Sequence, residues 1–197
     1  MILLHGYGSN GDDLIALAPM LQSILPDAAF VAPNAPTRCP GTAGGFQWWP
    51  IQSFSMQERS AGAIAAAPEL DAFISSELAE HGLAEDRLLL IGFSQGTMMA
   101  LHVGVRRPNP VAGIIGFSGM LVAPDLLESE AESRPPILLI HGDADPVVPF
   151  RSLAEAKRTL EAAGFSVAQH VSPGLGHNVD PAGIAAAADF ARKVLPA

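Results

Sequence analysis

Residues 92–96, with the sequence GFSQG, have the residue types of a nucleophilic serine on a sharp turn. An apolar run at residues 88–91 precedes them and a helical pattern follows, so a buried strand would turn directly into a helix. Small residues on both sides permit the tight turn, which lifts the serine hydroxyl clear of the sheet at the helix N-terminus. A serine that only caps the helix is the alternative. Because strand, serine and helix come in the required order, the pattern favours Ser94 as a nucleophile.

A second serine, Ser118, also ends an apolar run, in the segment GIIGFSGM at residues 113–120. Two positions after it stands Met120 rather than glycine, and no helical pattern begins there. We therefore expect Ser118 to have a structural role.

A serine hydroxyl needs a base to take its proton, and that base is a histidine oriented by a carboxylate. In the architecture that presents a serine on such a strand-to-helix turn, the order along the chain is Ser, Asp, His, with each residue at or after the C-terminal end of a strand. Asp145 in HGDADPVVP and His177 in the glycine-rich segment SPGLGHNVD fit this order. Asp143 remains the alternative acid, although it lies in the turn directly after the strand, where aspartates often accept from backbone amides.

The remaining histidines fit other roles better. We expect His81 to favour a helix C-terminus by its charge, and His102 to lie partly buried on the helix after Ser94. His5 precedes Ser94 in the chain, and His170 lies at the end of a predicted strand rather than inside a glycine-rich loop that could orient it.

Metal and thiol chemistry are not expected. His5, His141 and His177 all follow strands, but no spacing typical of zinc ligands occurs, so we predict no metal. The single cysteine, Cys39, lies in a Pro/Gly-rich stretch and cannot form an internal disulfide, which is typical of an incidental loop thiol.

Acyl transfer also needs hydrogen-bond donors for the oxyanion. The backbone amide after the nucleophile belongs to Gln95, and a second amide from an early strand-to-helix loop would fall at Tyr7, in the segment HGYG. The glycines on either side of Tyr7 allow the backbone to approach a substrate closely.

The order of elements along the whole chain predicts an α/β architecture that would position these side chains. Short apolar runs alternate with helical patterns, as in a mostly parallel sheet with helices on both faces. Pro68 lies inside the second helical region, where the helix either kinks or a new segment begins. The strands are expected near residues 2–4, 29–32, 87–92, 112–117, 136–141 and 166–171, and the helices near 12–24, 57–81, 95–107, 150–163 and 181–194.

A long loop at residues 33–55 separates the second strand from the second helix. It is rich in Pro and Gly, yet it contains Trp48 and Trp49, so it is expected to be an ordered cover that buries aromatic area. The two tryptophans either form a wall of an acyl-binding cleft or attach the loop to the body of the protein.

Composition places the chain among globular proteins and limits its partners. Its 197 residues are 49% hydrophobic and 16% charged, and no linker divides them, so one domain over residues 1–197 is expected. The net charge of -9 disfavours binding to nucleic acids and anionic membranes. No apolar run is long enough to span a bilayer and no signal segment occurs, so a cytoplasmic location is the default.

Several motifs together resemble the phospholipase/carboxylesterase family of α/β-hydrolases, relatives of the acyl-protein thioesterases. They are LLHGYGSNGDDL, the WWP loop, GFSQG with MMALH, GFSGML, HGDADPVVP and GLGH, in this order. The resemblance implies hydrolysis of carboxylic or thio esters by Ser94, His177 and Asp145. It also implies an oxyanion held by the amides of Tyr7 and Gln95, and no cofactor.

Two departures from the family pattern stand out. Thr97 occupies a position where family members usually have Gly, which would alter helix packing beside the nucleophile. Family members also usually have a strand before the LLHG run, whereas this sequence begins with that run. We therefore expect a sheet that lacks the usual N-terminal edge strand, and an apolar edge of this kind favours a homodimer.

The expected function is a serine carboxylesterase that cleaves short to medium acyl esters of small molecules through an acyl-enzyme. The enzymatic alternative is a thioesterase or lysophospholipase acting on acylated proteins or small thioesters. The non-enzymatic alternative is a binding or receptor protein that retains the pocket. The residues expected to line the acyl pocket are Trp48, Trp49, Met120, Leu121, Val147, Val148 and Leu175.

Overall fold

A parallel sheet forms the centre of the structure, a computed structural model that describes residues 1–22, 25–53 and 55–195. Within these residues the sheet has five strands in the order β1-β4-β5-β6-β7, and every neighbouring pair is parallel. This arrangement confirms the predicted α/β fold. The strands are β1 (Ile2–Leu4), β4 (Leu89–Phe93), β5 (Gly113–Phe117), β6 (Ile137–Gly142) and β7 (Val167–Ser172).

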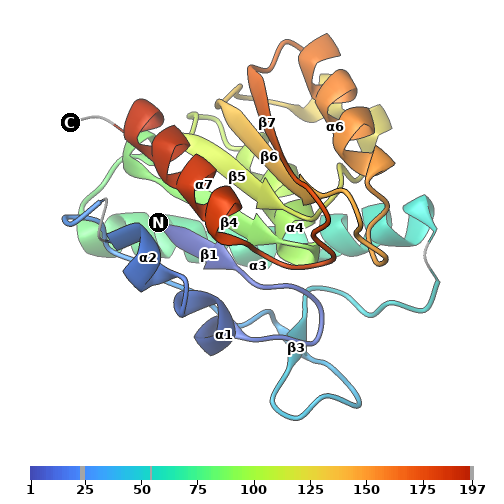
Figure 1. The fold of residues 1–197 in the computed structure, drawn as a ribbon. Coiled ribbons are helices and arrows are strands. Elements are labelled where there is room, and N and C mark those ends of the chain that lie inside the picture. The colour runs from blue at the N-terminus through green and yellow to red at the C-terminus, as the bar shows by residue number, and fades with distance from the viewer. Residues whose placement is uncertain (23–24, 54, 196–197) are drawn as a thin grey trace.

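Helices cover both faces of the sheet (Figure 1). Helices α3, α4 and α6 pack on one face, and α1, α2 and α7 pack on the other. Alternate residues of a strand serve the two faces: Leu90 joins the first core, and Leu89 and Ile91 join the second. This alternation explains the continuous apolar runs in the sequence. The helices are α1 (Gly11–Ile15), α2 (Ala18–Gln22), α3 (Met56–His81), α4 (Gln95–Gly104), α5 (Leu127–Glu130), α6 (Arg151–Ala162) and α7 (Pro181–Val194), with short 3-10 turns η1 (Glu85–Arg87) and η2 (Pro124–Leu126).

The strand predicted at residues 29–32 is reduced to an isolated parallel bridge between Val31 and Ile2. The Leu3 backbone N–H donates to the Val31 carbonyl at 2.8 Å. Pro33 follows, and because proline has no N–H group it cannot extend this ladder. The prediction of a full strand here was therefore wrong.

The single helix predicted at residues 12–24 is instead two short helices, α1 and α2. Pro19 is the second residue of α2. Its ring would clash with the carbonyl four residues earlier in a continuous helix, at Ile15, which is where α1 ends. Residues 23 and 24, at the end of the predicted helix, lie outside the described residues.

Helix α3 runs without interruption through Pro68, so no new segment begins there. Its first turn is capped by Ser55, whose side chain accepts from the Glu58 backbone N–H. Gly82, with φ of 62°, ends the helix in the left-handed conformation that glycine adopts readily. In the part of the chain that the structure describes, no helix is long and apolar enough to cross a membrane.

The loop at residues 33–55 contains a small antiparallel hairpin of β2 (Thr37–Arg38) and β3 (Phe46–Gln47). The backbone of Phe46 also pairs with the segment after β1: it accepts from Gly8 N–H at 2.8 Å and donates to the Ser9 carbonyl at 2.7 Å. The hairpin therefore braces the segment that contains Tyr7.

Candidate active site

Ser94 lies between β4 and α4 in a backbone conformation that L-residues rarely adopt, with φ of 54°. The glycines around it are required by close packing. A Cβ atom at Gly96 would clash with the Leu4 carbonyl, and one at Gly92 would clash with the Gly96 carbonyl. The Ser94 backbone N–H donates to the Phe117 carbonyl at 2.9 Å, which fixes the turn against β5.

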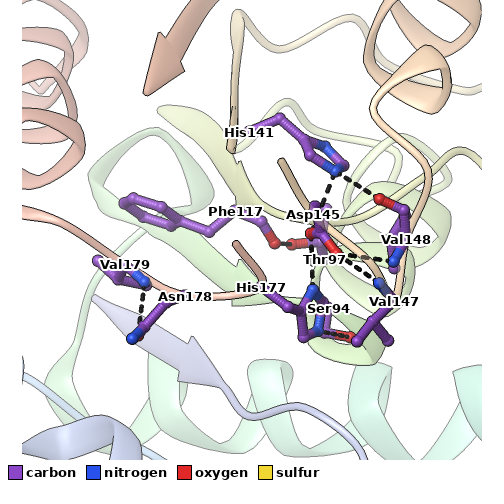
Figure 2. Close-up of polar contacts among 10 residues, drawn as sticks. All are labelled: Ser94, Thr97, Phe117, His141, Asp145, Val147, Val148, His177, Asn178 and Val179. Atoms are coloured by element: carbon purple, nitrogen blue, oxygen red, sulfur yellow. Dashed lines mark hydrogen bonds and ion pairs between the residues drawn. The ribbon is translucent and has the colours of Figure 1, made fainter. Parts of the chain in front are cut away.

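A chain of hydrogen bonds connects Ser94, His177 and Asp145 (Figure 2). The His177 Nε2 atom lies 3.0 Å from the Ser94 Oγ atom. On the other side of the ring, Nδ1 lies 2.7 Å from the Asp145 Oδ2 atom. Asp143, the alternative acid, instead accepts from the Gly174 backbone N–H at 2.6 Å. The structure thus brings Asp145 rather than Asp143 to the histidine.

The Asp145 carboxyl group is fully enclosed and surrounded by hydrogen-bond donors. Its Oδ1 atom accepts from the backbone N–H groups of Val147 at 2.8 Å and Val148 at 2.9 Å. Burial alone would raise the pKa of Asp145, but the hydrogen bonds from His177, Val148 and Val147 outweigh it, so the pKa lies below its usual value. Asp145 is therefore ionised at neutral pH, and Nδ1 of His177 donates to it. This leaves Nε2 of His177 free to accept a proton.

The two expected oxyanion donors, the backbone N–H groups of Tyr7 and Gln95, lie next to the hydrogen-bonded residues Ser94, His177 and Asp145. Among the described residues, no acceptor pairs with the backbone N–H groups of Tyr7 or Gln95. Gln95 is the first residue of α4, where the N–H has no acceptor within the helix. A Cβ atom on Gly6, the neighbour of Tyr7, would lie 3.2 Å from Ser94 Cβ, so this segment packs directly against Ser94.

Trp48 and Trp49 are each only 4% exposed and belong to the main hydrophobic core. The side chain of Gln95 binds the backbone of both: Oε1 accepts from Trp48 N–H at 2.9 Å, and Nε2 donates to the Trp49 carbonyl at 3.0 Å. The Trp49 ring also covers Gly62 of α3. These contacts attach the long loop to the body of the protein, which was one of the two roles predicted from sequence.

The other residues expected in the acyl pocket differ in exposure. Met120, Leu121 and Val148 are buried in the core. Val147 is 52% exposed beside Asp145, and Leu175 is half-buried in the loop that carries His177. Among the residues expected to line the acyl pocket, Val147 and Leu175 are the ones with solvent-exposed surface near Asp145 and His177.

Comparison with known proteins identifies the family. A model of the phospholipase/carboxylesterase family matches residues 1–195. The chain belongs to this family. Membership confirms the prediction of an α/β-hydrolase that acts on ester bonds.

Individual members of the phospholipase/carboxylesterase family are similar over almost the whole chain. Esterase YpfH of Escherichia coli is 28% identical over 196 residues, covering 100% of this chain and 83% of that protein. Acyl-protein thioesterase 1 of Schizosaccharomyces pombe is 31% identical over 205 residues, covering 99% and 90%. The crystal structure of esterase PE8 has a TM-score of 0.95 and 46% identity, covering 98% of this chain and 91% of that chain.

In the present chain, the Thr97 side chain contacts the backbone of both strands that flank the turn at Ser94. Its Oγ1 atom lies 2.8 Å from the carbonyl oxygens of Gly92 and Phe117, and its single hydrogen can be donated to one of them at a time. A Cβ atom at Gly116 or Gly119 would clash with the Thr97 side chain. Gly116 and Gly119 of the GFSG segment thus make room for Thr97, which stands where family members usually have Gly. These two glycines were the feature of the sequence that could have indicated this contact.

His5 has a structural role that the sequence did not indicate. It is buried, its Nε2 atom accepts from the Ala35 backbone N–H at 2.9 Å, and its Nδ1 atom donates to the Gly6 carbonyl at 2.7 Å. Its own carbonyl accepts from the Trp48 indole N–H at 3.0 Å. His5 therefore links the segment of Tyr7 to the long loop.

No group of three or more His, Cys, Asp or Glu side chains among the described residues is arranged to hold a metal ion. Cys39 is buried near the hairpin, and Ser118 is buried after β5.

Proposed function

We propose that the protein is a serine carboxylesterase in which Ser94, His177 and Asp145 form the catalytic triad. The observation that carries this proposal is the uninterrupted series of hydrogen bonds, with distances of 3.0 Å and 2.7 Å, beside two backbone N–H groups that have no acceptor among the described residues. A nucleophile, a base, an orienting acid and oxyanion donors are the parts that acyl transfer requires.

The geometry supports the following sequence of steps. The Ser94 oxygen attacks the ester carbonyl while its proton passes to His177 Nε2, and the N–H groups of Gln95 and Tyr7 stabilise the negative oxygen. His177 then protonates the leaving alcohol, which departs and leaves an acyl group on Ser94. Water gives a proton to His177 and attacks the acyl-enzyme. The bond between the acyl carbon and the Ser94 oxygen then breaks, His177 returns the proton to Ser94, and the carboxylic acid is released.

A preference for short to medium acyl chains is supported by the burial of most residues expected in the acyl pocket. Trp48, Trp49, Met120 and Leu121 are all below 9% exposure and are packed in the core. Val147 and Leu175 then offer a short apolar surface beside the triad. Nitrophenyl esters from acetate to palmitate test this preference, with kcat/KM expected to fall beyond medium chain length. A maximum at palmitate would contradict it.

Substitution of Ser94 by Ala tests the proposed nucleophile. S94A is expected to lose more than about 1000-fold in kcat on a nitrophenyl ester, and a fluorophosphonate probe should label the wild type but not S94A. Wild-type activity in S94A would contradict the assignment. Failure of the probe to label a folded wild-type protein would instead favour the non-enzymatic binding protein.

A thioesterase is the second candidate, because acyl-protein thioesterase 1 of Schizosaccharomyces pombe is 31% identical over 99% of this chain. The same three residues can cleave an oxygen ester or a thioester. Kinetics on the oxygen ester and the thioester of one acyl group separate the two candidates, with the oxygen ester expected to give the higher kcat/KM.

A cytoplasmic location and a homodimer are also proposed. Among the described residues, this edge of the sheet carries only the bridge between Val31 and Ile2 in place of a full outer strand, and a short edge of this kind supports a contact between two copies. Sedimentation equilibrium measures the mass in solution, and a monomer at all concentrations would contradict the dimer. Cell fractionation tests the location.

A further inference from the structure

A second histidine, His141, contacts the proposed catalytic acid from the side opposite to His177 (Figure 2). It lies in β6, and its side chain is 1% exposed. Its Nε2 atom lies 3.0 Å from the Val148 carbonyl oxygen and 3.3 Å from the Asp145 Oδ2 atom. The ring also meets that of Phe150 edge to face, with centroids 6.1 Å apart.

The two neighbours of His141 Nε2 determine where its proton is. A carbonyl oxygen can only accept a hydrogen bond, and the Asp145 carboxylate, ionised as argued above, can also only accept. Nε2 must therefore carry a hydrogen, which it donates to the Val148 carbonyl and which faces the Asp145 carboxylate. The 3.3 Å contact with Oδ2 is a close electrostatic approach, so it leaves the 2.7 Å bond from His177 in place.

We infer that His141 is a positioning residue for the triad, which holds the Asp145 carboxylate and the turn at residues 145–148 so that Oδ2 faces His177. This inference rests on the role proposed above for Asp145. The Oδ1 atom is already fixed by the N–H groups of Val147 and Val148. Without His141, the one group among the described residues that would still hold Oδ2 is the His177 ring, whose bond must stay in place while the charge of that ring changes.

His141 itself is rigid, which is what a positioning role requires. Its ring is buried in the protein interior at the end of a central strand, and its strong acceptor, the Val148 carbonyl, belongs to the same turn whose N–H groups bind Asp145. One imidazole thus fixes the turn through the backbone and the acid through its side chain.

Three variants test the inference. Gln can place its amide nitrogen where His141 Nε2 lies, Asn is too short to do so, and Met has the length of Gln without a donor. H141M and H141N are each expected to lose about 10- to 100-fold in kcat on a nitrophenyl ester, with KM within about 2-fold of wild type. H141Q is expected to retain kcat within about 3-fold of wild type. The inference is overturned if a folded H141M or H141N keeps wild-type kcat, or if H141Q loses as much as they do.

A double-mutant cycle with D145A separates positioning from a general structural role. If His141 acts through Asp145, then H141N in the D145A background should cause no further loss of kcat. A loss in that background equal to the loss in wild type would overturn the inference. Wild-type activity of D145A alone would instead overturn the triad assignment, so the two failures are distinguishable.

Discussion

The side chain of Gln95 holds the backbone of Trp48, with its Oε1 atom 2.9 Å from the Trp48 amide nitrogen. Gln95 is also the residue directly after the nucleophile, and its backbone N–H is a proposed oxyanion donor. One residue therefore connects the start of α4 to the long loop at residues 33–55. The order of that loop is expected to depend on this side chain.

Substitution of Gln95 by Ala should loosen the loop. Two buried hydrogen bonds are lost, and the backbone groups of Trp48 and Trp49 are left without partners, which should lower the free energy of unfolding by about 2–4 kcal/mol. Limited proteolysis should cut within residues 33–55 faster than in wild type. Q47A is a matched control, because among the described residues the Gln47 side chain donates to the Arg38 carbonyl at 3.3 Å, within the hairpin, and does not join the loop to α4. Q47A should therefore be cleaved more slowly than Q95A. Equal cleavage rates in Q95A and wild type would contradict this role.

Replacement of each loop aspartate by Asn should distinguish the catalytic acid from its neighbour. D145N removes the charge that orients His177 Nδ1, and kcat should fall by about 1000-fold or more. D143N keeps an oxygen that can accept from Gly174 N–H, and kcat should stay within about 3-fold of wild type. Steady-state kinetics on one ester measure both. The opposite ranking would reassign the acid to Asp143.

The close packing of Thr97 over Gly116 predicts a compensating pair of substitutions. G116A should lower the free energy of unfolding by about 1–3 kcal/mol, because its new methyl group clashes with the Thr97 methyl. Adding T97S removes that methyl and keeps the hydroxyl, so most of the loss should be recovered. Urea unfolding of the two single variants and the double variant measures the effect. Additive losses would show that the two side chains do not compete for the same space.

Protonation of His102 should destabilise the fold at acidic pH. Burial on α4, together with the nearby Arg106 charge, lowers its pKa from 6.5 to about 4, against a smaller opposing effect of Glu130. Between these two values the unfolded chain binds a proton that the folded chain does not. The stabilising contribution is therefore complete above pH 6.5 and is lost as the pH falls towards 4, by up to about 3 kcal/mol.

Chemical denaturation from pH 7 to 4 checks this effect. The free energy of unfolding of wild type should fall more steeply over this range than that of H102N, in which residue 102 does not titrate. Parallel curves for the two proteins would show that His102 does not contribute.

The fold was largely predictable because the central strands are buried on both faces. Their continuous apolar runs, such as that of β6, are typical of buried strands in a parallel sheet. Strands β4, β5, β6 and β7 begin and end within two residues of the predicted bounds. The two wrongly predicted elements, the strand at residues 29–32 and the helix at residues 12–24, lie where a proline restricts the backbone. Pro33 limits the outer strand to a bridge, and Pro19 divides the first helix, whereas Pro68 lies inside α3 without ending it.

The candidate triad could be located because its residues follow strands in a fixed order along the chain. The supporting contacts could not, because they join residues far apart in sequence. Nothing local indicates that Gln95 binds Trp48 or that His5 accepts from Ala35 N–H. The contact of His141 with Asp145 joins residues only four apart, yet it depends on a turn whose shape the sequence does not specify.

The left-handed φ of Ser94 has an evolutionary consequence. A backbone angle of 54° suits glycine, and holding a residue with a side chain there costs of order 1–3 kcal/mol. S94G would relieve this conformation, whereas S94A would not, although both lack the hydroxyl. S94G is therefore expected to be more stable than S94A, which means that the nucleophile proposed here is kept at a cost in stability.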